Sequence, residues 1–96
     1  MTADALCAKA RETMVERGKT YDPDGGEQER SMPRIVAAFN ALTGHALTET
    51  DGWQFMLLLK LVRGRVTPGH EDSALDGVAY AALAGESALR SPAAAE

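Results

Sequence analysis

Two short groups of polar residues stand close together in the C-terminal half of the sequence. Lys60 and Arg63 are three positions apart within a largely apolar run, and Asp72 and Asp76 are four positions apart shortly afterwards. Residues three or four apart share a face of an α-helix, so each pair is expected to project from one face of its helix. Tyr80 extends the second face by another four residues. Together these residues could form a polar cluster between two helices.

Lys60 most needs an explanation, because every other residue from 55 to 62 is apolar. An ammonium group placed there either extends to water or pairs with a carboxylate in a covered site. A short turn after this run would join two antiparallel helices, in which positions equidistant from the turn face one another. This geometry predicts that Lys60 pairs with Asp76.

The same geometry places Arg63 near Glu71 or Asp72, and the resulting cluster has two interpretations that the sequence leaves open. In the structural interpretation, a buried group of ion pairs fixes how the two helices align. In the functional interpretation, the same residues hold a ligand or a metal ion.

The elements that position these residues are predicted to be helices, because the chain is 45% hydrophobic but only 5% aromatic. Glycine at position 18, a capping serine at 31, a capping box at 48–51 and a turn at 67–70 mark the boundaries. The expected helices cover about residues 3–17, 32–43, 49–65 and 71–90. The predicted fold class is all-α, a compact bundle of about four helices in one domain over residues 1–96, with a frayed tail at 91–96.

The size of the chain predicts a thin core. A domain of 96 residues buries only about 60–65% of its unfolded surface. Four helices can hardly cover a third helix that is apolar on all sides from 55 to 62. We therefore expect a homo-oligomer. Cys7, the only cysteine, is expected in the core.

Charge and hydropathy exclude several classes of partner. The net charge of −4 and the pI near 5.1 argue against a broad nucleic-acid surface, which requires an excess of Lys and Arg. The apolar run at 55–62 is too short to span a membrane, and residues 1–10 lack the apolar segment of a signal peptide. A cytoplasmic protein with no membrane partner is expected.

A further candidate binding element is the glycine-containing segment 18–28. Lys19 and Tyr21 are expected in a loop at 18–28, where a cation and an aromatic ring could hold a phosphate and a base. We expect this loop to converge with the basic end of the third helix. The predicted ligand-binding set is Lys19, Tyr21, Lys60, Arg63 and Arg65.

The Lys-x-x-Arg and Asp-x-x-x-Asp-x-x-x-Tyr patterns occur together with a basic residue shortly before Tyr21 and an aromatic residue in the second predicted helix. In this combination, over residues 16–86, the chain resembles an uncharacterised family of small proteins encoded by bacteriophages and prophages. It departs from the family pattern at Asp22 and Ser31, where members have glycine and asparagine. The resemblance implies a viral origin, an infected or lysogenic bacterial host and a helical fold, but no activity.

A weaker, fold-level similarity connects such proteins with the all-α nucleotide pyrophosphohydrolases of the MazG type, which hold magnesium with acidic residues on neighbouring helices. A hard cation between phosphates needs several oxygen ligands. In this chain only Asp72, Asp76 and Glu86 could contribute, because the second predicted helix carries no acidic residue.

The favoured hypothesis is a non-enzymatic phage accessory protein that binds a small anionic ligand, such as a nucleotide or a nucleotide signal, without a cofactor or a metal. Sequestering a host signal would be a counter-defence role. Two alternatives stay open. One is a Mg²⁺-dependent nucleotide pyrophosphohydrolase, and the other is an interaction module that inhibits a host protein.

Overall fold

Four α-helices make up the part of the chain that the computed structural model describes, residues 1–21 and 31–90. They are α1 (Ala3–Tyr21), α2 (Ser31–Thr43), α3 (Glu49–Val66) and α4 (Glu71–Arg90). These described residues contain no strand, so the predicted all-α bundle is confirmed. The predicted tail at 91–96 lies outside them.

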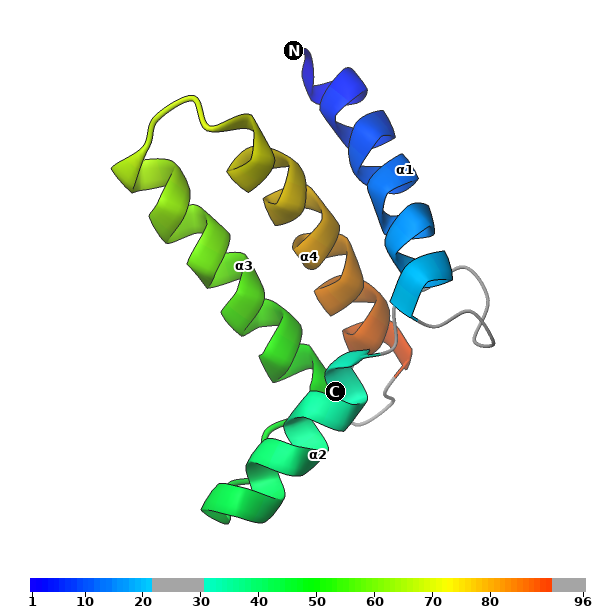
Figure 1. Cartoon of the computed structure of the whole chain (residues 1–96), viewed down its shortest axis with the longest axis vertical. Helices are drawn as coiled ribbons and strands as arrows, with labels where there is room; N and C mark the ends of the chain where they lie inside the picture. The colour runs from blue at the N-terminus through cyan, green and yellow to red at the C-terminus, as the bar shows by residue number, and fades with distance from the viewer. Residues whose placement is uncertain (22–30, 91–96) are drawn as a thin grey trace.

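α4 is the central helix of the bundle. It runs antiparallel to α3 on one side and in the same direction as α1 on the other, while α2 lies across the end of the bundle where α3 begins (Figure 1). The connection between α3 and α4 is a tight turn, in which the backbone N–H of His70 donates to the carbonyl of Thr67 at 3.2 Å. Gly69 adopts φ +80° there, a conformation that favours glycine.

The connection between α2 and α3 is held by side chains at both ends. The amide of Asn40 donates to the carbonyl of Leu47 and accepts from its N–H, both at 2.9 Å. Thr48 then caps α3: its hydroxyl accepts from the N–H of Asp51, whose carboxylate accepts from the N–H of Thr48. The predicted capping box is confirmed.

The apolar core lies where α2 meets the start of α3 and the end of α4. Trp53 is only 2% exposed and stacks against Tyr80, with ring centroids 5.9 Å apart. No large side chain in the described part of the chain is completely buried. The core cluster consists of Met32, Val36, Trp53, Leu83 and Ala84, flanked by Met14, Met56 and Tyr80.

Helix α1 differs from its prediction in length and in its packed face. It continues past Gly18 to Tyr21, because a glycine inside a helix costs only about 1 kcal/mol and Gly18 is buried rather than terminal. Ala10 is fully buried and Met14 follows it one turn later. Cys7 lies beside this face and is exposed, so its predicted burial is wrong.

Several large apolar residues of the bundle are exposed. In α2 Met32 and Val36 are buried, whereas Ile35, Phe39 and Leu42 face outward. In α3 the side turned away from α4 is apolar and exposed. The bundle therefore leaves an apolar surface on α2 and α3 uncovered.

The described helices include none with the length and apolarity needed to cross a membrane.

A substitution at Gly52 tests the contact between α2 and α3. A Cβ atom at Gly52 would overlap the Sδ of Met32 and lie 3.1 Å from Cγ1 of Val36. We expect Gly52→Ala to lower the free energy of unfolding by roughly 1–3 kcal/mol through overpacking. Gly85→Ala is the control, because no atom lies within 4 Å of its added Cβ and alanine favours the helix. Chemical denaturation that ranks the two variants equally would contradict this packing.

Candidate functional site

The carboxylate of Asp76 joins three helices. Its Oδ2 lies 3.0 Å from Nζ of Lys60 on α3, and its Oδ1 accepts a hydrogen bond of 3.0 Å from Nη2 of Arg17 on α1. The predicted pairing of Lys60 with Asp76 is therefore confirmed, and Arg17 completes a group that we call the Asp76 bridge.

Burial differs among the members of the Asp76 bridge. The side chains of Asp76 and Lys60 are 10% and 12% exposed, while that of Arg17 is 33% exposed. Two cations share one anion, so the group carries a net positive charge. The water-facing guanidinium of Arg17 can disperse that charge, whereas the ammonium of Lys60 depends on the carboxylate.

Arg17 was missed by reasoning from sequence because its partner is 59 residues away and no local spacing marks the pair. The adjacent charged residue Glu16 also suggests that this part of the helix faces water. A usable signal was its position three residues after Met14 and seven after Ala10, on the packed face of α1.

The other members of the predicted polar cluster lie elsewhere. Arg63 is exposed and forms no ion pair with Glu71 or Asp72, among the residues that the structure describes. Glu71 instead approaches Nζ of Lys9 at 3.5 Å. α4 covers the face of α3 that carries Lys60. Arg63, three positions further along α3, therefore points to the side of that contact. Asp72 is likewise exposed.

Tyr80 belongs to the apolar core and not to a polar face. It packs on Trp53, with an angle of 26° between the rings. The ring of Tyr80 therefore contributes to the core, and it does not extend the face of α4 that carries the acidic side chains.

The two predicted basic elements are not brought together. Lys19 lies in the last turn of α1, and Arg65 lies in the last turn of α3. Because α1 and α3 run in opposite directions on either side of α4, these turns are at opposite ends of the bundle (Figure 1). Lys19 is 3.8 Å from Glu16 on its own helix. Tyr21 ends α1 instead of standing in a loop.

A groove of about 930 Å³ lies between the second half of α3 and the first half of α4, with the start of α1 at its side. Its polar members include Lys60, Arg65 and His70. Arg65 is exposed and pairs with no acidic residue in the described ranges. Much of the remaining lining is apolar and includes Leu6, Leu57, Leu61, Val78 and Ala81.

His70 and Ser73 form a hydrogen-bonded pair in the lining of this groove. The Nδ1 of His70 is 2.7 Å from the hydroxyl of Ser73 and also accepts from the backbone N–H of Ser73 at 3.3 Å. Ser73 is buried. A side chain that precedes a helix and accepts from the third residue is in the position of an N-cap, which is a structural role.

The alternative metal set is not assembled. Asp72, Asp76 and Glu86 all lie on α4, and fourteen residues of helix span roughly 21 Å. Asp76 is already held by two cations, and Glu86 approaches Arg90 at 3.7 Å. Within residues 1–21 and 31–90, no group of three or more His, Cys, Asp or Glu residues could hold a metal ion.

Comparison with protein families matches residues 5–88 to the Domain of unknown function (DUF6378). The chain belongs to this family. The DUF6378 match includes all three residues of the Asp76 bridge. No curated protein and no solved structure matched the chain. The phage origin and the similarity to MazG-type enzymes therefore stay predictions.

The Asp76 bridge generates a stability test with a matched control. Asp76→Ala leaves the ammonium of Lys60 without its carboxylate in a covered site, and we expect it to lower the free energy of unfolding by about 3 kcal/mol. Asp72→Ala removes an exposed carboxylate from the same helix and is expected to cost less than about 0.5 kcal/mol. Thermal and urea unfolding measure both. Equal stability of the two variants would show that Lys60 is solvated rather than paired.

Proposed function

We propose that the protein binds a small anionic ligand in the groove between α3 and α4, without catalysing a reaction. The observation that supports this most directly is the position of Arg65, a cation with no acidic partner in the described ranges, at an otherwise largely apolar groove. The ligand class is an anion with an apolar or aromatic body, of which a nucleotide is the favoured example.

The size and chemistry of the groove agree with such a ligand. Small-molecule sites commonly have volumes of about 300–1,000 Å³ and combine apolar walls with a few polar groups. A phosphate at Arg65 would receive two hydrogen bonds from one guanidinium. Lys60 could add a donor, because an ammonium has three N–H groups and Asp76 does not occupy all of them.

The charge of the chain favours a small ligand over a polymer. The formal charge of −4 opposes the approach of an extended phosphate backbone, whereas one or two cations are enough for a mononucleotide or a dinucleotide. If the chain is encoded by a phage, as the sequence resemblance implies, sequestering a host nucleotide signal is the role that we propose for this binding.

A non-catalytic role is supported by the chemistry of the groove lining. The hydroxyl of Ser73 is its one hydrogen-bonded candidate nucleophile, and its partner His70 also accepts the backbone N–H of Ser73. The geometry is that of a helix cap. The acidic residues expected for a Mg²⁺-dependent hydrolase are spread along α4.

Calorimetric titration with mono-, di- and cyclic nucleotides tests this proposal. We expect binding that weakens with added salt and that falls about tenfold or more in Arg65→Ala, because a charged hydrogen bond contributes about 1.5–3 kcal/mol. Lys19→Ala is the matched control. It removes an exposed cation from the opposite end of the bundle and should leave the affinity unchanged.

Three outcomes would contradict the proposal. If no nucleotide binds, and native mass spectrometry finds no small molecule on the purified protein, the groove is not a site for this class. Equal losses in Lys19→Ala and Arg65→Ala would locate binding elsewhere. Turnover of a nucleotide with Mg²⁺ would favour the hydrolase alternative.

A further inference from the structure

An uncovered apolar stripe runs along α3. Phe55, Leu58 and Val62 are 70%, 59% and 61% exposed. Their spacing of three and four residues places them on one face of the helix, opposite the face that carries Trp53 and Lys60 toward α4. We call these three residues the outer stripe. None of them lines the groove.

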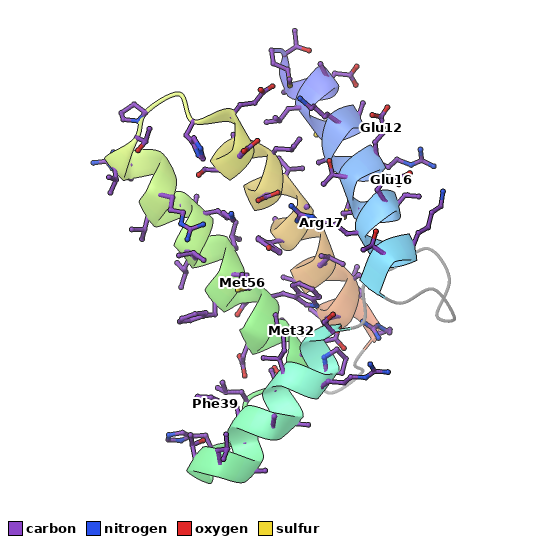
Figure 2. The ribbon with its side chains drawn as sticks, in the orientation of Figure 1. Glu12, Glu16, Arg17, Met32, Phe39 and Met56 are labelled. Atoms are coloured by element: carbon purple, nitrogen blue, oxygen red, sulfur yellow. The ribbon has the colours of Figure 1, made fainter. Side chains whose placement is uncertain are left out.

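The outer stripe belongs to a larger apolar surface that includes α2. Figure 2 shows Phe39 on the side of α2 that faces the same way as the outer edge of α3. Nine exposed apolar side chains of α2, α3 and the loop between them contribute to this surface. They are Ile35, Phe39, Leu42, Leu47, Phe55, Leu58, Leu61, Val62 and Val66, of which Leu61 also lines the groove.

The apolar area of this surface matches one side of a standard protein interface. A large apolar side chain offers roughly 60–120 Å², given transfer energies of about 1.5–3 kcal/mol at about 25 cal/mol per Å². Nine such side chains, exposed by 41–87%, present on the order of 500 Å². A standard interface buries about 800 Å² per partner, of which about 56–65% is apolar.

We propose that this surface binds a second copy of the chain, with the two α3 helices packed antiparallel around Leu58. The order of residues along the outer face supports self-association. Asp51 stands at one end of the outer stripe and Arg65 at the other, both exposed and each seven residues from Leu58. An antiparallel pair sets Phe55 of each copy close to Val62 of the other, and it places Asp51 of each copy opposite Arg65 of the other.

A two-fold arrangement of this kind uses the same patch on both copies, which is the commonest form of protein dimer. A parallel pairing would place like charges side by side at both ends, which is unfavourable. Arg65 lies at the border of the stripe and of the groove, and its five N–H donors can serve both an acidic side chain and a ligand. The dimer does not depend on ligand binding.

The mass of the protein in solution tests the proposal, with one variant inside the surface and one outside. Light scattering at micromolar concentration should give twice the chain mass of 10.2 kDa for the wild type. Leu58→Glu places two carboxylates at the two-fold axis and should give a monomer with unchanged helical content. Leu89→Glu is the control, since Leu89 on α4 is 85% exposed and lies outside the surface.

Disulfide trapping tests the direction of the pairing. In a Cys7→Ser background, which removes the only cysteine, Leu58→Cys should form a covalent dimer under mild oxidation. Val62→Cys should not, because antiparallel helices centred at Leu58 separate the two positions by roughly 12 Å along the axis. Disulfides require Cα atoms within about 7 Å.

The proposal is overturned by a wild-type monomer, which would leave the surface for a different protein. It is also overturned by a dimer that persists in Leu58→Glu, which would place the interface elsewhere. Efficient trapping of Val62→Cys would refute the antiparallel orientation. A failure of the protein to bind nucleotides would change neither its mass in solution nor the result of disulfide trapping.

Discussion

The carboxylate of Asp76 is the polar contact on which the arrangement of the three long helices depends. It sits on the central helix and presents one oxygen to each neighbour, Lys60 on α3 and Arg17 on α1. α1 contributes little to the apolar core beyond Ala10 and Met14, and its second ion pair, Lys9 with Glu71, is exposed and therefore weak. A directional, largely buried contact thus fixes α1 where apolar packing alone is sparse.

The apolar core and the groove lie at opposite ends of α4. One end of the helix closes the core around Trp53, and the other end lines the groove beside Lys60 and Arg65. The Asp76 bridge lies between them. An anion bound in the groove would therefore lie next to a group with a net positive charge, which favours its approach, while the core on the far side stays independent of the ligand.

Much of the architecture could be predicted from local sequence signals, and the failures have physical causes. The capping box at Thr48 and the turn before α4 are local signals. The short turn also predicted Asp76 as the partner of Lys60, because it sets the two positions opposite one another. Arg17 escaped prediction because its partner is distant in sequence. Phe39 and Phe55 are exposed, and periodicity alone could not show this, because it identifies an apolar face but not whether the same chain covers it. The prediction that Lys19 and Arg65 converge is wrong, because the directions of α1 and α3 decide which helix ends lie together, and sequence spacing does not give these directions.

The sharing of one carboxylate by two cations also constrains how the sequence can diverge. A neutral residue at 76 leaves two positive charges facing each other across α4, and a neutral residue at 60 leaves the carboxylate to a single, partly exposed guanidinium. A change at any one of positions 17, 60 and 76 is therefore expected to require a compensating change at the others. Within the family, substitutions at these three positions are expected to covary even though they lie far apart in the chain.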